Sequence, residues 1–210
     1  AGGDIKDLNL TIQHLNNDSI SRISAAGDVS FTIIPMFPSQ GIKVNGPGRL
    51  ELIVGGSVDL GNSTGIVSKG NLENPYLPVG GADILVMAGI TSPDYSGFLK
   101  YLQDNGLSVG SDSSPDGLRD RFYTLLRDFG NEAVSGGGEP AYEKGRAAIR
   151  ALFPASVVSK GNIDLFYSAI KTEQGGRIDL LAPGGGVTVG IANPSSTIPK
   201  KKAADQGLFT

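Results

Sequence analysis

The 210-residue chain contains no cysteine and no tryptophan, and histidine occurs only once. Without cysteine there is no disulfide framework, no thiolate zinc site and no thiol nucleophile. The single His14 excludes a metal centre built from three imidazoles, and with no partner set evident in the sequence it also argues against a serine triad. We therefore expect no metal, no cofactor and no catalytic residue.

Clustered positive charge and long apolar runs are also missing. Lysine and arginine total 18 against 21 acidic residues, and the formal net charge is −3. Nucleic-acid binding needs clustered cations to neutralise phosphates, so we expect no nucleic-acid partner. No stretch of 18 apolar residues occurs, and we expect no membrane insertion. Residues 1–5 lack the features of a signal peptide, and we expect the chain to be a segment of a longer one.

Glycine, by contrast, is abundant, with 31 residues. A short motif repeats along the chain: a glycine, a polar residue, and then apolar residues at alternate positions. Its clearest copies are residues 3–5, 27–31, 48–52, 56–60, 161–165 and 176–180, with looser copies at 81–86 and 186–189. Alternation with a period of two is typical of strands, so each copy predicts a short strand. We attribute the leading glycine to corner backbone angles that a Cβ would obstruct.

The spacing of these glycines distinguishes between β architectures. Successive copies are 24, 21 and 8 residues apart near the start and 15 and 10 apart near the end. The short intervals suit successive sides of one coil, and those in the low twenties suit a whole coil. This favours a solenoid over an antiparallel sandwich, which stays the alternative because it also has short alternating strands.

Between residues 91 and 155 the apolar period becomes helical. Ser92 and Ser114, each followed by proline, predict two helix starts, and a third helix is expected from about Pro140 to Phe153. The sequence thus predicts coils over 1–90, a helical insertion over 91–155, and coils continuing the same solenoid over 156–210. We expect the helices to pack on an outer apolar seat of the coils, formed by Ile34, Ile53, Phe166 and Leu181.

The insertion is the feature that building a solenoid explains least. Long excursions from repeat arrays commonly carry binding sites. We therefore predict that it presents an exposed recognition surface to a protein or glycan, and the candidate partner-binding residues are Tyr95, Tyr101, Arg119, Arg121, Tyr123 and Tyr142. The alternative is that the helices only cap or thicken the solenoid.

Polar residues recur within the repeat. The acidic positions are Asp4, Asp28, Glu51, Asp59, Asp83, Asp164 and Asp179. A catalytic carboxylate pair would be singular, so we interpret these repeated acids as a solvated outer face. The asparagines expected at turns are Asn45, Asn62, Asn71, Asn162 and Asn193. They either bond the backbone of neighbouring coils or occupy turns alone.

Two blocks, residues 46–67 and 170–185, resemble signature blocks of the filamentous haemagglutinin family, the large exoproteins of Gram-negative bacteria. Residues 71–78 and the helical region between the blocks are similar to the same family. The resemblance implies a right-handed parallel β-helix, export by two-partner secretion and display on, or release from, the cell surface. It also implies adhesion, biofilm formation or self-association, and in some members haem-carrier binding or toxin delivery. The blocks resemble the shaft of these proteins more than their secretion domain.

The sequence and the resemblance together predict a mainly β protein: a right-handed parallel β-helix with an inserted three-helix subdomain. We expect a non-enzymatic segment of a secreted surface exoprotein that acts in adhesion or surface interaction and belongs to a virulence-related class. Its expected partners are a protein or glycan on a host or neighbouring cell and, for the parent chain, an outer-membrane secretion partner. The alternatives are a β-helix polysaccharide lyase or hydrolase and an intracellular scaffold.

Overall fold

The computed structural model describes residues 1–34, 40–72, 74–190 and 207–209. The chain divides into two compact units. The first, which we call the β unit, consists of Ala1–Thr91 and Ser159–Thr210, and the second, the helical unit, of Ser92–Val158. The sequence placed the helical insertion at 91–155, whereas the helical unit ends at Val158.

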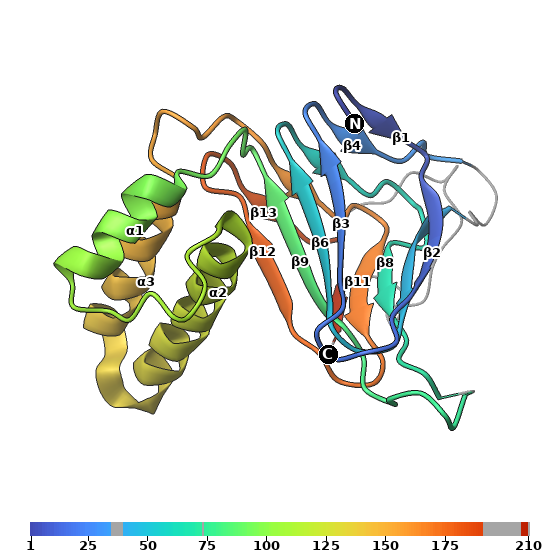
Figure 1. The fold of residues 1–210 in the computed structure, drawn as a ribbon. Coiled ribbons are helices and arrows are strands. Elements are labelled where there is room, and N and C mark those ends of the chain that lie inside the picture. Colours follow the sequence, from blue (N-terminus) through green and yellow to red (C-terminus); the bar gives the residue numbers. More distant parts are fainter. Residues whose placement is uncertain (35–39, 73, 191–206, 210) are drawn as a thin grey trace. The chain divides into compact units, whose positions relative to one another are not determined.

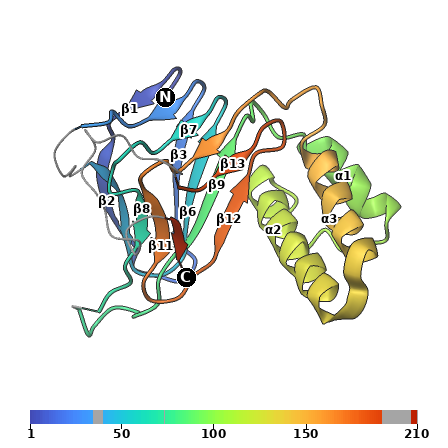
Figure 2. The same cartoon turned by 180° about the vertical axis from the view of Figure 1, so that it is seen from behind.

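The β unit contains three sheets in which all paired strands are parallel (Figures 1 and 2). Sheet A runs in spatial order β1 (Ile5–Lys6), β4 (Val29–Ser30), β7 (Val58–Asp59), β10 (Ile163–Asp164) and β13 (Val187–Thr188). Sheet B runs β14 (Gly207–Phe209), β11 (Ala169–Thr172), β8 (Ile66–Ser68), β5 (Gly41–Asn45) and β2 (Asn9–Gln13). Sheet C runs β12 (Ile178–Leu181), β9 (Asp83–Ala88), β6 (Arg49–Val54) and β3 (Ile20–Ala25).

The chain visits these sheets in one repeating order, A then B then C. Each return to a sheet places a strand beside the one laid down on the previous visit. We call one passage through the three sheets a coil. Because the paired strands are parallel, the antiparallel sandwich considered from the sequence is wrong. The glycine-led motifs form the strands of sheet A and three strands of sheet C, β6, β9 and β12. Strand β3 of sheet C and the strands of sheet B lack that motif and were not recognised by it.

The apolar core of the β unit lies on the inward faces of the three sheets. In sheet A, Val29 stacks on Val58 and Val58 on Ile163, and all three side chains are fully buried. In sheet C, Leu50, Leu52 and Val54 stack on Ile84, Val86 and Ala88 of the next strand. Stacking of equivalent residues buries each apolar side chain against its counterpart one coil away, which is the main stabilising contribution of such an array.

Corner side chains connect each coil to the next. The Asp28 amide donates to Oδ1 of Asp4 at 3.0 Å, and the Ser57 amide donates to Oδ1 of Asp28 at 2.7 Å. The Asn162 amide donates to Oγ of Ser57 at 3.1 Å, and the Gly186 amide to Oδ1 of Asn162 at 2.9 Å. We call these five positions the corner ladder. Each residue directly precedes a strand of sheet A. The first four side chains, those of Asp4, Asp28, Ser57 and Asn162, each satisfy a backbone donor of the following coil.

The corner ladder explains two of the glycines that precede its positions, Gly27 and Gly56. A Cβ on Gly27 would overlap Oδ1 of Asp4, and a Cβ on Gly56 would overlap Oδ1 of Asp28. Neither glycine has a positive φ, so the predicted reason, unusual backbone angles, is wrong at this corner. The predicted reason is correct for two glycines that precede strands of sheet C, since Gly48 has φ 93° and Gly176 has φ 108°.

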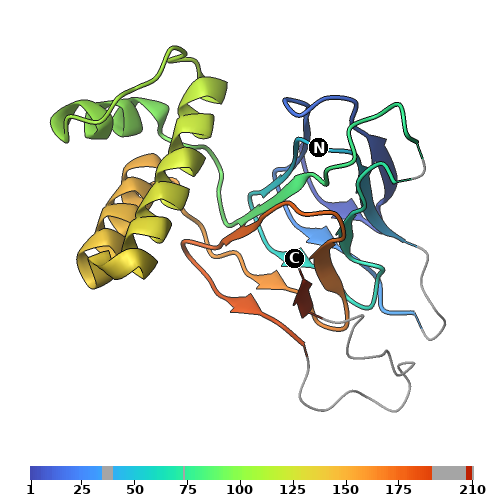
Figure 3. The same cartoon turned by 90° about the horizontal axis from the view of Figure 1, so that it is seen from below.

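The helical unit contains α1 (Tyr95–Asp104), α2 (Pro115–Glu132) and α3 (Gly138–Leu152), with a tight connection, Ala133–Gly137, between the last two (Figure 3). The α2 start is as predicted: Ser114 caps it, accepting from the Gly117 amide at 3.2 Å. The α1 start is different, since Asp94 rather than Ser92 caps it by accepting from the Gly97 amide at 2.8 Å.

Aromatic rings form the core of the helical unit. The Phe122 ring packs edge-on against Phe98 and Phe153, with ring centroids 5.6 Å apart in both pairs. All three side chains are buried, together with Leu102 and Leu152. Helices of this length are marginal alone in water, so this shared core is what holds the three of them in place.

The helical unit interrupts the coils without changing their register. Strands β7 and β10, which flank the insertion in sheet A, pair directly, with Val58 opposite Ile163. Before and after the insertion, Gly89 and Ser159 are hydrogen bonded, with the Ser159 amide donating to the Gly89 carbonyl at 2.8 Å. The two chain ends of the insertion therefore meet on the β unit.

Candidate interaction surfaces

The six residues predicted to bind a partner come from all three helices. Tyr95 and Tyr101 lie on α1, Arg119, Arg121 and Tyr123 on α2, and Tyr142 on α3. Tyr142 is 46% exposed, whereas Arg119 and Tyr123 are only 6% and 8% exposed. The prediction that all six are exposed is therefore wrong for Arg119 and Tyr123, whose apolar neighbours on α2 place them on a buried face of the helix.

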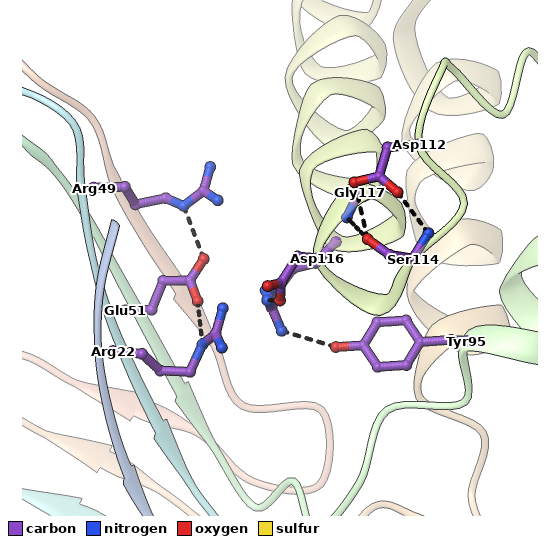
Figure 4. Close-up of polar contacts among 9 residues, drawn as sticks. Arg22, Arg49, Glu51, Tyr95, Asp112, Ser114, Asp116 and Gly117 are labelled. Atoms are coloured by element: carbon purple, nitrogen blue, oxygen red, sulfur yellow. Dashed lines mark hydrogen bonds and ion pairs between the residues drawn. The ribbon is translucent and has the colours of Figure 1, made fainter. Parts of the chain in front are cut away.

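Within the helical unit, several of these side chains hold the helices together. Arg119 donates from Nη1 to the Tyr95 hydroxyl at 2.9 Å and also pairs with Asp116 (Figure 4). The Tyr101 hydroxyl donates to the Lys144 carbonyl at 3.3 Å, and burial raises the pKa of that hydroxyl. These contacts join α2 to α1 and α1 to α3. Of the six predicted residues, Tyr95 and Arg119 thus contact each other, and Tyr101 connects α1 to α3.

Local capping fixes the segment that leads into α2. Asp112 accepts from both the amide and the hydroxyl of Ser114, at 2.8 and 2.9 Å, and Ser114 accepts from Gly117 (Figure 4). The hydrogen bond from the Ser114 amide lowers the pKa of Asp112, as the Gly97 amide lowers that of Asp94. These carboxylates have structural roles at helix starts.

The accessible side of α3 carries paired charges around Tyr142. Arg146 pairs with Glu139 and Glu143, and Arg150 pairs with Glu143. The arginine hydrogen bonds lower the pKa of Glu143. Surface ion pairs of this kind contribute little to stability because water and salt screen them. These charges and Tyr142 make up the exposed side of the helix.

In the β unit, the outward face of sheet C carries a charge cluster. Glu51 accepts from Nε of Arg22 at 2.8 Å and from Nε of Arg49 at 2.9 Å (Figure 4). The Glu51 side chain is fully buried, so the interpretation of the repeated acids as solvated is wrong at this position. On the same face, burial raises the pKa of Asp179.

The proposed apolar seat is not one surface. Ile53 and Leu181 occupy one column of the outward face of sheet C, with Met87 between them. Ile34 and Phe166 follow strands β4 and β10 of sheet A instead. Alternation along a strand gives the face on which a residue lies but not the sheet, and this is why the sequence grouped them.

One exposed surface of the β unit was not predicted. The segment between β8 and β9 exposes Leu72 by 63%, Tyr76 by 94% and Val79 by 52%. Asn71 anchors it, donating to the Pro78 carbonyl at 2.9 Å and accepting from Gln13 at 2.7 Å. From the sequence, Asn71 was recognised only as a turn asparagine and not as the anchor of an exposed segment.

Asn62, Asn71 and Asn162 bond neighbouring coils through their side chains, as one of the two alternatives predicted. Asn62 exchanges two hydrogen bonds with the Ile34 backbone, and Asn162 belongs to the corner ladder. Asn193 lies outside the described residues. The single histidine also has partners: His14 contacts the Pro47 carbonyl through Nδ1 at 2.7 Å and the Ser21 hydroxyl through Nε2 at 2.8 Å.

The repeated carboxylates of the β unit mostly serve its backbone. Asp4 and Asp28 accept from coil amides, and Asp83 accepts from the Arg177 amide at 2.7 Å. Among the described residues, no group of three or more histidine or acidic side chains is arranged to hold a metal ion. A search of the same residues finds no helix long and apolar enough to span a membrane.

The chain was compared with protein families, curated proteins and solved structures. No protein-family model, curated protein or solved structure matches the chain.

Proposed function

We propose that the β unit is a segment of a right-handed parallel β-helix. The supporting observation is the repeated A–B–C order of the strands, which continues in register on both sides of the helical unit. Right-handedness follows from the strong preference of parallel crossover connections for that hand. In such an array each coil contacts only its neighbours, so an insertion between coils leaves the rest of the stack intact.

We further propose that the chain is a non-enzymatic segment of a secreted bacterial surface exoprotein that acts in adhesion or surface interaction. The resemblance to the filamentous haemagglutinin family suggests this role, together with an outer-membrane secretion partner for the parent chain. The rigid coils would act as a support, and the helical unit would present Tyr142 and the paired charges of α3 to a cell-surface protein or glycan.

The alternative is a polysaccharide lyase or hydrolase. Acid–base catalysis of this kind needs carboxylates directed at a substrate. Asp4, Asp28 and Asp83 instead accept hydrogen bonds from backbone amides, which supports the non-enzymatic role. Incubation with pectic and acidic polysaccharides tests it, because new reducing ends or unsaturated uronates would contradict the proposal.

Binding to a glycan array and to bacterial and host cells tests the role of the helical unit. The chain is compared with a variant in which residues 92–158 are replaced by a short turn, which the bond between Gly89 and Ser159 makes feasible. We expect the variant to keep its strands and lose binding. The matched point variants are Tyr142→Ser and Tyr76→Ser, one exposed tyrosine from each unit. Binding that survives the deletion but not Tyr76→Ser would move the interaction to the β unit.

A further inference from the structure

One corner glycine lacks the contact that explains the others. The residues two positions before the first residue of each sheet A strand are Gly3, Gly27, Gly56, Gly161 and Gly185. A Cβ at any of the last four would come within 3.0 Å of an atom of another coil. For Gly3, by contrast, the described residues place no heavy atom within 4 Å of that position. Gly3 also has no positive φ.

The absence of a side chain at Gly3 would be explained by a contact with an atom that is not among the described residues. Glycine lowers stability relative to alanine where its conformational freedom is not needed, because it loses more chain entropy on folding. At Gly27 and Gly56 it is needed because the capping oxygen of the adjacent coil occupies the Cβ position. A coil stacked on β1 with the same corner chemistry would place an oxygen over Gly3 in the same way.

The rest of the first coil has the same open side. Its inward apolar residues are only partly buried, whereas their partners one coil further on are fully or almost fully buried: Ile5 with Val29, Ile12 with Val44, and Ile23 with Leu52. The amides of Ile5 and Asp7 donate to β4, so the Lys6 amide between them points to the opposite side of β1. Apolar surface and backbone donors thus lie along one edge.

We propose that the edge formed by β1, β2 and β3 is a docking surface for a further coil of parallel strands whose sheet A corner carries aspartate, asparagine or serine. That side chain accepts from the Asp4 amide and lies over Gly3, as Asp4 does for Asp28 and Gly27. The inference rests on the proposed stacking of coils and not on the proposed adhesive role.

The corner ladder also determines which partner fits. A second copy of this chain, stacked in the same direction, would bring its opposite end, β13, against β1. The corner residue of β13 is Gly186, which has no side chain and provides no acceptor for the Asp4 amide. The docking coil is therefore chemically different from that end of this chain.

A tandem chain tests the proposal. A copy of residues 3–24 is placed directly before Ala1, so that the copy runs into Ala1 as Ser24 runs into Ala25, with the whole natural chain retained. Gly3→Ala is then made in the natural and in the tandem chain. We expect Gly3→Ala to leave unchanged or raise the urea midpoint of the natural chain and to lower that of the tandem chain. The same effect in both chains would overturn the proposal.

The capping side chain is tested in the tandem chain itself. Replacing the aspartate of the copy that corresponds to Asp4 by alanine should lower the urea midpoint, while replacement by asparagine should preserve it. Exchange of the Asp4 and Lys6 amides should slow at least about tenfold on addition of the copy. Unchanged exchange would show that no coil docks there and would overturn the proposal. So would self-association of the natural chain that Gly3→Ala abolishes, because a second copy would then be the occupant.

Discussion

The two units use the same residue types to satisfy backbone donors, but over very different distances along the chain. In the helical unit, Asp94 and Ser114 accept from amides three residues ahead. In the β unit, Asp4 accepts from an amide 24 residues away, and Ser57 from one 105 residues away. The comparison shows that a local cap stabilises one element, whereas a cap in the corner ladder stabilises the junction of two coils.

The same contrast applies to glycine. Gly130 lies within α2, and no described heavy atom is within 4 Å of the position of a Cβ there. Gly161 lies against the backbone of Gly56 and Gly89. We therefore expect that alanine can replace Gly130, where the added Cβ has space. Alanine cannot replace Gly161 without displacing the backbone of another coil.

The largest effect is expected for Phe122→Ala. It removes the ring that contacts Phe98 and Phe153, and truncation of a buried phenylalanine costs about 3–5 kcal/mol. Residue-resolved amide exchange should show loss of protection in the three helices, while β6 and β9 stay protected. Loss of protection in both units together would contradict their treatment as separately stable parts.

A smaller but still large loss is expected for Gly161→Ala. The new Cβ would meet backbone atoms that cannot move without displacing two strands, at a cost of about 3 kcal/mol. The free energy of unfolding from urea titration measures it. The matched control is Gly130→Ala, which should raise the stability of the helical unit by about 0.5–1 kcal/mol. Equal effects at the two glycines would remove the contrast between the units.

Loss of a cap should cost about 1 kcal/mol in either unit. Asp28→Ala removes the acceptor for the Ser57 amide, and Ser114→Ala removes that for the Gly117 amide. A synthetic peptide of residues 112–132 should also lose helicity, measured by circular dichroism, with Ser114→Ala, because both bonded groups lie within it. Asp28→Asn serves as the control and should retain the stability of the β unit, since its side-chain oxygen still accepts.

The smallest effects concern pH and have opposite signs in the two units. Burial raises the pKa of Asp179, so its charge opposes folding once the pH exceeds that pKa. Asp179→Asn should therefore raise the urea midpoint at pH 7, and the gain should vanish below the ordinary aspartate pKa of about 3.9. Asp112 has a lowered pKa, so Asp112→Asn should lower the midpoint at pH 7 and have no effect at low pH. Equal signs at pH 7 would contradict these electrostatic environments.

Many strands and helices could be predicted from the sequence because their patterns involve residues close together in the chain. Alternating apolar residues after glycine predicted the strands of sheet A and three of the strands of sheet C, and Ser114 with Pro115 predicted the start of α2. The strands of sheet B were not recognised because they lack the glycine–polar motif. Ser92 was predicted as the cap of α1 because proline follows it, and only the coordinates show that Asp94 is the residue whose oxygen accepts from the Gly97 amide.

The candidate surface was less predictable than the fold. Helical periodicity placed Tyr123 and Arg119 on α2, but their exposure depends on which helix faces are covered in the folded chain. Glu51 was grouped with the capping acids as a repeated outward carboxylate, yet it is buried between two arginines that come from adjacent strands. Tyr76 was overlooked because a single exposed aromatic residue in a loop leaves no periodic signal.

By itself, the sequence determined where the strands of sheet A, three strands of sheet C and the three helices form, because alternation after glycine, helix caps and helical periodicity depend on residues close together in the chain. Tertiary structure alone decided which strands pair, why Gly27 and Gly56 must be glycine, and which oxygen satisfies which amide. Those contacts join residues tens of positions apart. Their partners are fixed only when the coils stack, because only then do the capping oxygen and the facing amide occupy neighbouring positions in space.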